Sequence, residues 1–592
     1  MKKKSKKANQ QNRKSTHAGF WNIVKFLPLL LFICVMPLVV KMKVVQMDGV
    51  EAVWLPDPFV YVDVFNYYKF RLIQVVGVLS VCFMAMEWVL NNIKPIKVKR
   101  DWAILGFAGV VIVSSILSPH KAIAMNGYAE RWHGMTTWLS YIAVFLYGRS
   151  IIRTPKDLKV ILRMLLFSGF TLMGIGTLQF FGLDPFRLDF VKKLIATKEI
   201  LEQGGLDQIK FTFDKTRVYS TLYNPNNVGI ISVGFIPLAI YGLKSESNKI
   251  LKGLWGFLAI FSLICLYGSE SRAGMVALVV AFVIYFVINM AQLKSHYNQI
   301  LLGLVGILII TFVVNFTTDG IVVERAKSIL PEPDQIVGIK NIEVHSKNLL
   351  VEYNDEVIQF QHDPNAVGNI YSVLNENQKN IDVLQGRDGF FNFADLKYQG
   401  LLYGYGVYKD NQYYLAIKHN GQQYNFAILD EGLKFINQYG KLVELKTVEK
   451  LGFKNQQVMG SNRGYIWSRS IPLLKEYSLV GSGPDSFVLR FPQTDYIAKG
   501  IYYQDYKQVV DKPHNQYIGW FVETGLLGLG FILLWSFRIV LKAKGSVLVN
   551  SSLAILLTLL FYDISVSTGW LLIVGLCMVE QLMHIRNDTK TV

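Results

Sequence analysis

The strongest constraint on the fold is a series of apolar runs, interrupted once by a long hydrophilic stretch from Thr317 to Pro513. A hydrocarbon layer about 30 Å thick is crossed by about 20 apolar residues in a helix. Lipid-exposed backbone satisfies its polar groups only in helices or closed barrels. Since 52% of the 592 residues are hydrophobic, the chain is predicted to be an integral membrane protein built from helices.

The apolar runs predict about twelve spans. They lie near 22–40, 70–90, 102–118, 135–150, 162–182, 227–243, 251–267, 275–291, 300–316, 517–536, 547–562 and 568–583. The expected fold class is an all-α polytopic membrane protein with an inserted extracytoplasmic domain that is mainly β.

The same runs divide the chain into five parts. These are a basic cytoplasmic N-terminus (1–21), a membrane domain of about nine spans (22–316), an extracytoplasmic region (317–513), about three further spans (514–583) and a cytoplasmic tail (584–592). The extracytoplasmic region is itself divided into a β domain at about 338–450 and a membrane-proximal helical part at 455–513.

Lys and Arg in the short connections set the orientation, because cytoplasmic loops carry an excess of both. Five basic clusters lie on one side when twelve spans are threaded in order, and they put both termini in the cytoplasm: Lys2–Lys14, 94–100, 149–159, 244–252 and 538–544. The net charge of +18 is then mainly a signal of topology, and no nucleic-acid partner is expected. The basic N-terminus lacks a small-residue cleavage site, so we expect a retained first span.

Within the hydrophilic stretch, residues near 338–450 alternate apolar and polar. Tyr413–Ile417 and Tyr424–Ile428 flank Asn420-Gly421, a dipeptide typical of tight hairpins. Residues 462–477 have helical spacing and are expected to pack back onto the membrane domain. All four cysteines fall inside expected spans, so no disulfide framework or zinc site is predicted.

Polar and titratable residues gather in the segments expected on the outer face. A histidine there exchanges protons near neutral pH, and arginine forks bind phosphate oxygens. The candidates are Glu130, Arg131 and His133 in one loop, Arg217, Asn224 to Asn226 at the mouth of a span, Arg272 in a short turn, Arg463 and Arg469 after the β domain, and His514-Asn515 before the tenth span.

In this order the segments resemble the O-antigen ligase and polymerase family of bacterial membrane glycan transferases. The matching motifs are Arg131-x-x-Gly134, Asn224-Pro225-Asn226, Ser271-Arg272-Ala273, Arg463-x-x-x-Trp467 leading to Gly481-x-Gly483-x-x-x-Phe487, and His514-Asn515 leading to Glu523-x-Gly525-x-x-Gly528. The β domain has no counterpart that we recognise, so the acceptor is less constrained than the chemistry.

The resemblance implies en bloc transfer of a glycan from a polyprenyl (undecaprenyl) diphosphate to an acceptor glycan, lipid or protein outside the membrane. His514 is the expected base, and Arg272 and Arg131 complete the expected catalytic set. The expected substrate-binding residues are Arg463, Arg217, Glu130, His133, Asn226, Asn515 and Arg469. No Asp-x-Asp cluster adjoins the motifs, so we expect no metal and no cofactor.

Several of these residues also have structural interpretations. Arg272 could be an anchor at the headgroups, and the Asn224–Asn226 segment could cap a helix. Glu130 could pair with Arg131 or His133 or assist proton transfer, and Glu523 is expected to pair with an arginine because a lone buried carboxylate is costly.

At the level of function, a polymerase that joins lipid-linked repeat units is the closest alternative. A lipid-linked glycan flippase or other transporter is less favoured, because the arginines lie mostly at the outer span ends and not at the bilayer midplane. A sensor or adhesion scaffold is less favoured, because the expected cytoplasmic side offers only short basic loops. The β domain tilts the choice toward a ligase, since it could recruit a dedicated acceptor.

Overall fold

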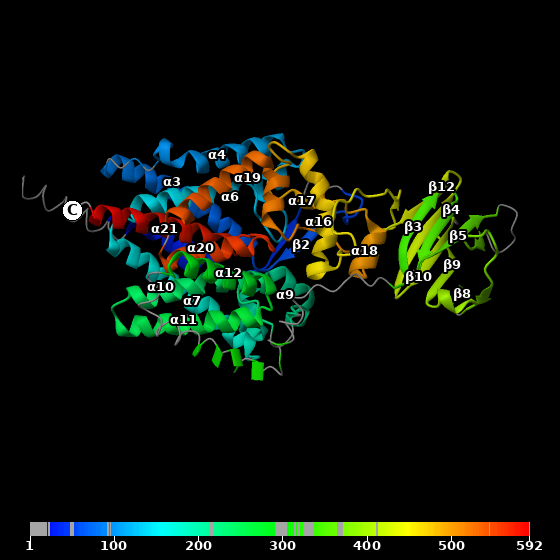
Figure 1. Ribbon diagram of the computed structural model, residues 1–592, viewed down its shortest axis with the longest axis horizontal. Helices are drawn as coiled ribbons and strands as arrows, with labels where there is room; N and C mark the ends of the chain where they lie inside the picture. Colours follow the sequence, from blue (N-terminus) through cyan, green and yellow to red (C-terminus); the bar gives the residue numbers. More distant parts are fainter. Residues whose placement is uncertain are drawn as a thin grey trace, which may run out of the picture.

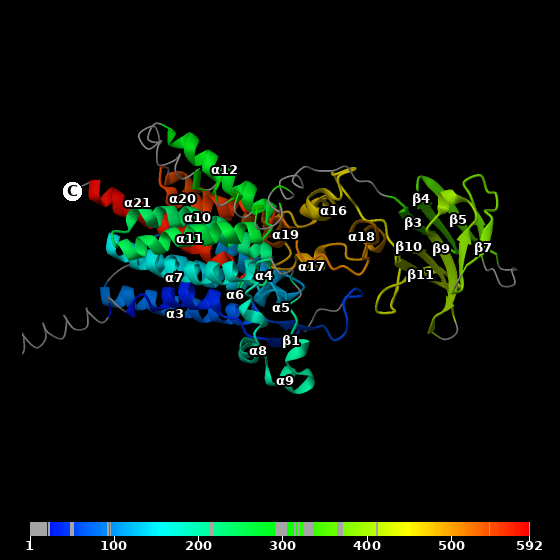
Figure 2. The same cartoon turned by 90° about the horizontal axis from the view of Figure 1, so that it is seen from below.

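The computed structural model describes residues 21–590, apart from 22–23, 48–51, 92–93, 95, 212, 214–216, 291–304, most positions of 307–336, 364–370, 387, 410–411 and 544. The predicted basic N-terminus up to residue 20 lies outside the described residues, as does about half of the expected span 300–316. The described chain has two parts, a bundle of long helices and a separate β-rich lobe, joined by short helices (Figures 1 and 2).

Seven described helices are long and apolar enough to cross a membrane. They are α3 (Tyr67–Asn91), α4 (Val98–Leu117), α7 (Pro155–Phe180), α10 (Pro225–Ser245), α11 (Lys249–Gly268), α19 (Gln516–Lys542) and α21 (Gly569–Lys590). Leu27–Leu38, α12 (Arg272–Ile288) and α20 (Val547–Thr558) are shorter apolar helices, and α6 (Met135–Ile151) has 17 residues. The count of twelve spans and the outward placement of the β lobe stay predictions.

The segment Leu27–Leu38 shows why length alone does not define a span. It consists of α2 (Leu27–Leu30), the π-helical η1 (Leu31–Val35) and the 3-10 helix η2 (Met36–Leu38), with prolines at 28 and 37. Proline removes a backbone donor and disfavours a regular helix interior. This segment leans on neighbouring helices, with contacts to α3 and α7.

The helices of the bundle pack closely through their apolar faces. α3 lies along α6, α10 lies against α11 and α20, and α4 lies along α19. α6 is nearly enclosed, with Tyr141, Phe145 and Tyr147 fully buried. The four cysteines are free, as the sequence predicted.

The β-rich lobe contains two antiparallel sheets, in the orders β13-β12-β11-β10-β9-β8-β7 and β3-β4-β5-β6. Its strands are β3 (Ile339–His345), β4 (Asn348–Tyr353), β5 (Glu356–His362), β6 (Tyr371–Leu374), β7 (Val383–Gln385), β8 (Phe390–Phe393), β9 (Leu401–Val407), β10 (Tyr413–His419), β11 (Gln422–Leu429), β12 (Gly432–Ile436) and β13 (Leu442–Val443). The hairpin at Asn420-Gly421 is confirmed, because both residues have positive φ and Ile417 pairs with Tyr424.

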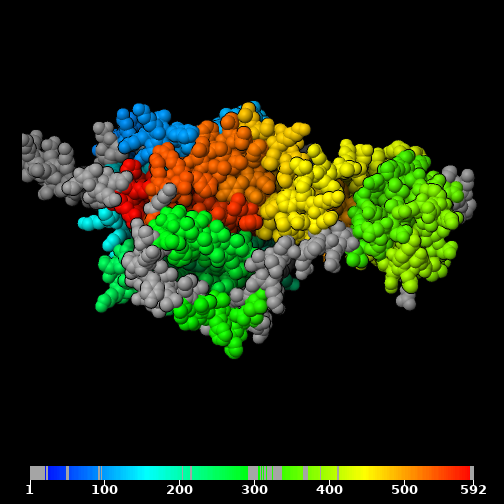
Figure 3. All heavy atoms as spheres, in the orientation of Figure 1, coloured from blue at the N-terminus to red at the C-terminus, as the bar shows by residue number. Residues whose placement is uncertain are grey.

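One apolar core links the two sheets to each other and to the short helices. Phe360 of β5 and Tyr403 of β9 meet edge to face, with ring centroids 5.3 Å apart. Tyr496 of α18 (Tyr496–Tyr503) is buried in the same core and lies 4.8 Å from the ring of Phe435. The lobe is therefore attached through α18 and stands beyond the membrane-proximal helices (Figure 3).

Two more helices join the lobe to the bundle, α16 (Met459–Glu476) and α17 (Phe487–Arg490). Gly460, Ser461 and Asn462 have positive φ, so the regular part of α16 begins at Arg463. α16 and α17 both contact α19, which agrees with the prediction that this part packs back onto the membrane domain.

Candidate active site

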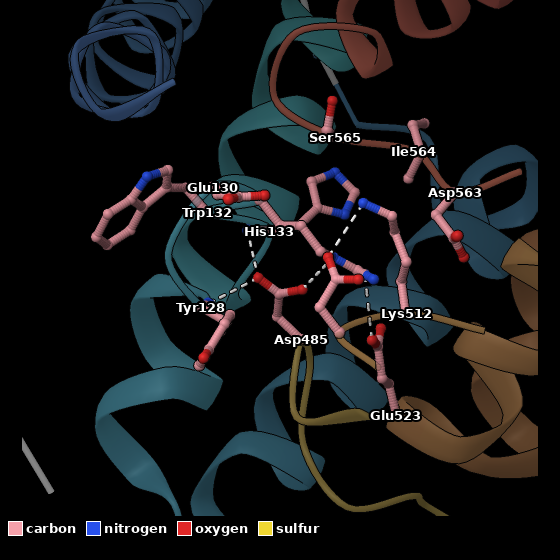
Figure 4. A network of polar contacts seen from close by, with 12 residues as sticks. Tyr128, Glu130, Trp132, His133, Asp485, Lys512, Glu523, Asp563, Ile564 and Ser565 are labelled. Atoms are coloured by element: carbon pink, nitrogen blue, oxygen red, sulfur yellow. Dashed lines mark hydrogen bonds and ion pairs between the residues drawn. The ribbon is translucent and has the colours of Figure 1, made fainter. Parts of the chain in front are cut away.

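The predicted motifs meet at the end of the helical bundle that faces the β lobe. They lie on the loop before α6, the N-termini of α10, α12 and α16, the loop before α17 and the segment before α19. The connection between α20 and α21, residues 559–568, also reaches this end (Figures 1 and 4).

The loop before α6 is held in a fixed shape by carboxylates from other elements. Asp485 accepts backbone N–H bonds from Tyr128 (2.8 Å) and His133 (3.0 Å) at one oxygen. The indole of Trp132 donates to Asp63 at 2.7 Å. Glu130 and Trp132 have positive φ (71° and 49°), an uncommon conformation for such residues. Together these hydrogen bonds fix the backbone conformation of the loop that carries Arg131.

Arg131 joins two carboxylates in a buried ion network, and Figure 4 labels both of them, Asp485 and Glu523. Its Nε lies 2.6 Å from Asp485 Oδ1, and its Nη2 lies 3.4 Å from Glu523 Oε1. All three side chains are at most 5% exposed. Burial alone would lower the pKa of Arg131, but the two carboxylates raise it, so the guanidinium stays charged. The predicted pairing of Glu523 with an arginine is confirmed.

Two glycines, Gly481 and Gly525, allow the loop before α17 to approach α19 at backbone distance. Gly525 interrupts α19 with φ 67° and ψ −173°, and the freed backbone pairs with the loop. Ser482 N donates to Val522 O, and Gly483 N donates to Glu523 O at 3.0 Å. A methyl group at Gly481 or Gly525 would overlap the facing backbone. The Gly-x-Gly and Glu-x-Gly motifs therefore form one structural unit that places Asp485 and Glu523.

His514 is positioned by its two neighbours in sequence. The indole of Trp467 donates to Pro513 O at 2.8 Å. Asn515, a predicted substrate ligand, caps the N-terminus of α19 by accepting N–H bonds from Tyr517 and Ile518. His514 itself has φ 50°, and its ring lies 5.9 Å from that of Tyr562.

The surroundings keep the His514 imidazole neutral. Its Nδ1 lies 3.8 Å from Asp563 Oδ2, and its side chain is 27% exposed. Burial, followed by the charges of Lys512 and Arg463, lowers its pKa to about 3. A neutral imidazole has one nitrogen free to accept a proton.

Two further cations lie in this region: Arg463 of α16 is near His514, and Arg272 of α12 is near Arg463. Burial lowers the pKa of Arg463, Tyr562 and Asp563 oppose this, and the nearby charge of Arg272 lowers it further. The Nε of Arg463 has no hydrogen-bond partner among the described residues. Arg272 is the first residue of α12, after the cap residue Ser271, whose hydroxyl accepts from Gly274 N.

Asp563, Lys512 and Asp511 belong to this site, although no motif drew attention to them. Lys512 Nζ lies 3.0 Å from Asp511 Oδ2. Burial alone would lower the pKa of Lys512, but Asp511 raises it. Asp563 is 3% exposed, and burial raises its pKa to about 6 although Arg131 and Lys512 oppose this. The sequence signal that could have identified Asp563 is its position as a lone acidic residue between two apolar runs.

Two residues of the first predicted loop have other contacts than expected. Glu130, for which the sequence left pairing with Arg131 or His133 and assistance in proton transfer open, accepts hydroxyl bonds from Tyr61 (2.9 Å) and Tyr223 (3.1 Å). Burial raises the pKa of Glu130. The His133 ring is 1% exposed and lies 4.6 Å from the ring of Trp138.

The remaining predicted residues are divided between the site and the scaffold. Asn224 caps α10, as the structural interpretation expected, whereas Asn226 hydrogen-bonds the hydroxyl of Tyr562. Arg217 precedes Val218, whose N–H donates to Gly268 O near the turn of Arg272. Arg469 pairs with Asp495 at 3.0 Å and lies over the Tyr465 ring, so its guanidinium holds the membrane-proximal helices together.

The geometry suits acid–base chemistry beside an anion. A neutral imidazole, two arginines and a buried carboxylate occupy one end of the bundle, where charge-assisted hydrogen bonds are strong. In the described part of the chain, no group of three His, Cys, Asp or Glu side chains has the arrangement of a metal site. Metal-independent catalysis stays a prediction.

Comparison with known proteins finds one family model that matches part of the chain. The model of a family described as O-antigen ligase matches residues 424–534, a range from within β11 through α16 and α17 into α19. It contains Arg463, Asp485, His514 and Glu523. No curated protein and no solved structure matches the chain. An O-antigen ligase domain at 424–534, in a chain of apolar helices, supports membership of the O-antigen ligase and polymerase family.

Proposed function

We propose that the protein moves a glycan en bloc from a polyprenyl diphosphate to an acceptor outside the cell membrane, with His514 as general base. The observation that carries the proposal is the convergence of His514, Arg463 and Arg272 at one end of the bundle. The three residues come from separate motifs and share one site.

Arg463 and Arg272 stabilise the leaving group in this proposal. Negative charge builds on the diphosphate as the bond to the sugar C1 breaks. Hydrogen bonds from charged donors to such oxygens contribute about 1.5–3 kcal/mol each, and guanidinium forks match phosphate geometry. The unpartnered Nε of Arg463 is available for this among the described contacts.

His514 takes the proton of the attacking hydroxyl. A pKa of about 3 makes His514 a weak base, because burial and then the charges of Lys512 and Arg463 disfavour the imidazolium. A bound diphosphate offsets these positive charges, so donor binding raises the basicity of His514. The base then becomes effective only when the donor is present, and Asp563 at 3.8 Å stabilises the imidazolium that forms.

Attack on the face opposite the diphosphate inverts the anomeric centre. This consequence is tested by determining the linkage configuration in the lipid-linked donor and in the transferred product. Retained configuration would require a covalent intermediate. In that case the proposed single displacement, with His514 as base, would be wrong.

The acceptor separates a ligase from a polymerase, and we favour a ligase because of the β lobe. Cells lacking the protein distinguish the two. Accumulation of full-length glycan on polyprenyl diphosphate indicates a ligase, and accumulation of single repeats indicates a polymerase. If surface glycan is unchanged in these cells, the protein is neither a ligase nor a polymerase of that glycan.

The position of the site argues against a transporter, which holds its substrate near the bilayer midplane. Point variants test the placement directly. His514→Ala and Arg463→Ala should fail to restore surface glycan at normal protein levels. The matched controls His120→Ala and Arg71→Ala, in a loop and on an exposed part of α3, should restore it.

A further inference from the structure

A short segment projects sideways from the bundle at the end that carries the candidate site. It follows α7 and contains η3 (Pro185–Arg187), α8 (Asp189–Ile195) and α9 (Lys198–Gly204). Figure 2 shows α8 and α9 outside the row of long helices, below α3 in that view and toward the β lobe. The chemistry proposed above does not use this part of the chain, residues 181–204, which we call the lateral segment.

Large apolar side chains are exposed along the lateral segment. Five of them, each at least 59% exposed, are Phe181, Leu183, Leu188, Phe190 and Leu194. Single exposed apolar residues are common on protein surfaces, whereas a concentration of them marks a surface that contacts a membrane, a protein or a ligand. The exposed side chains of the lateral segment therefore indicate a contact surface.

The helix α8 is apolar on two sides. Ile195 is buried in an apolar cluster, and Val191 packs against the same cluster. Phe190 and Leu194 are four residues apart, so they share one face of the helix, and both are exposed. A surface helix that only covered the protein would carry polar residues on its outer side. The outer side of α8 is therefore suited to a second apolar environment.

The lateral segment is fixed to the rest of the protein by polar contacts. Lys41 Nζ donates to the carbonyl oxygens of Leu194 and Ala196, both at 2.9 Å, at the C-terminus of α8. The hydroxyl of Tyr219 donates to Asp184 Oδ2 at 2.6 Å. The exposed face of α8 is therefore held at a defined place beside the candidate site.

The exposed face continues the apolar surface of a long helix. Phe181 directly follows the last residue of α7, which is long and apolar enough to cross a membrane. Leu178, in the last turn of α7, is also exposed. The apolar surface thus passes from a candidate span onto the lateral segment without a polar boundary at Phe181.

The direction of the lateral segment fits the surface of a bilayer. The long helices run along the axis of the bundle (Figures 1 and 2), so a segment that projects sideways from their ends lies parallel to the membrane plane. Interfacial helices bury an apolar face about 5–10 Å into the boundary between headgroups and acyl chains. Lys193 and Lys198 are exposed on the same segment, and lysine side chains extend their ammonium groups toward lipid phosphates.

We propose that the lateral segment lies on the bilayer surface next to the candidate site, with Phe190 and Leu194 among the upper acyl chains and Lys193 at the lipid phosphates. The partner is the lipid surface itself. This contact goes beyond the proposed transfer reaction and does not depend on it.

Fluorescence quenching by lipid tests the contact in the full-length protein. Cys34→Ala and Cys82→Ala remove the two cysteines that are not buried. A fluorophore is then attached to a single new cysteine, in Leu194→Cys or in Phe190→Cys. Each labelled protein is placed in vesicles of phosphatidylethanolamine and phosphatidylglycerol, with or without lipid that is spin-labelled in the upper acyl chain.

Two labelled controls define the range of the measurement. Val78→Cys lies on an exposed part of α3, where Val78 is 66% exposed, and its label should meet lipid. Leu396→Cys lies in η6 (Leu396–Tyr398) of the β lobe, where Leu396 is 80% exposed, and its label should meet water.

We expect the spin-labelled lipid to reduce the fluorescence of the labels at Leu194 and Phe190 about twofold or more, as for Val78, because an interfacial helix places its apolar face at that depth. The label at Leu396 should be unaffected. If either label on α8 behaves like the one at Leu396, the lateral segment does not lie on the bilayer. Energy transfer between labelled copies without quenching by lipid would instead place a second copy of the chain on this face, and would also overturn the proposal.

Discussion

Replacing Arg131 with methionine should destabilise the protein far more than replacing an exposed arginine. The substitution keeps an unbranched side chain but leaves Asp485 and Glu523 buried without their cation. The two charge-assisted contacts are worth about 1.5–3 kcal/mol each, and breaking a buried ion pair from one side costs about 3–5 kcal/mol. We expect Arg131→Met to lower the free energy of unfolding by about 3–5 kcal/mol.

The assay is chemical unfolding in mixed micelles, followed by tryptophan fluorescence. Arg71→Met is the matched control, because Arg71 lies on the exposed side of α3 with bonds to Tyr67 and Gln74, and its effect should stay below about 0.5 kcal/mol.

A triple variant identifies the cause. In a background of Asp485→Asn and Glu523→Gln, Arg131→Met should cost much less, because no buried carboxylate is left unpaired. An equal loss in both backgrounds, or a loss no larger than that of Arg71→Met, would refute the electrostatic reasoning.

Three further predictions follow from single positions. Asp563→Asn should abolish transfer yet stabilise the fold at pH 8 by about 2–3 kcal/mol. The pKa of Asp563 is about 6 in the folded protein and about 3.9 in the unfolded chain. Its contribution to stability is therefore full at low pH and is lost as the pH rises through 6. A pH series of unfolding on wild type and variant checks the sign, and equal stability at pH 8 contradicts it. Gly525→Ala should destabilise the fold by at least about 2 kcal/mol, because Gly525 has a positive φ and contacts the facing backbone. Gly530→Ala on the same helix is the control, because a methyl group there meets open space. Equal free energies of unfolding for the two variants would show that the kink is dispensable. A chelator should leave transfer by purified protein unchanged, and activity lost with chelator and restored by a divalent cation would remove the metal-independent mechanism.

The sequence was sufficient for the local elements with strong periodicity. The hairpin at Asn420-Gly421 and the helix after Asn462 follow from patterns within a few residues, since turn chemistry and apolar spacing are local properties. The pairing of Glu523 with an arginine also followed, because an unpaired buried carboxylate is too costly to retain.

The contacts across the site could not be predicted in the same way. Arg131 pairs with Asp485, 354 residues later, and spacing carries no information over such a separation. Asp563 lies between α20 and α21 without a motif, and Glu130 accepts hydrogen bonds from two tyrosine hydroxyls that are far from it in the sequence. The side chain of Asn515, an expected substrate ligand, caps α19, a local role that its motif did not indicate.

Apolar length was also an imperfect guide to spans. α20 has 12 residues, which extend about 18 Å at 1.5 Å per residue, less than a hydrocarbon core. The Leu27–Leu38 segment is equally short and irregular. Such helices need protein neighbours to complete a crossing, and a hydropathy pattern does not contain those neighbours.

The central claim is tested most directly by glycan analysis of cells that lack the protein, complemented with wild type, His514→Ala, Arg272→Ala or His120→Ala. We expect lipid-linked glycan to accumulate in the deletion. Wild type and His120→Ala should clear it, and the His514 and Arg272 variants should not, at equal protein levels. Unchanged surface glycan in the deletion, or full complementation by His514→Ala, would contradict a transferase with its base at His514.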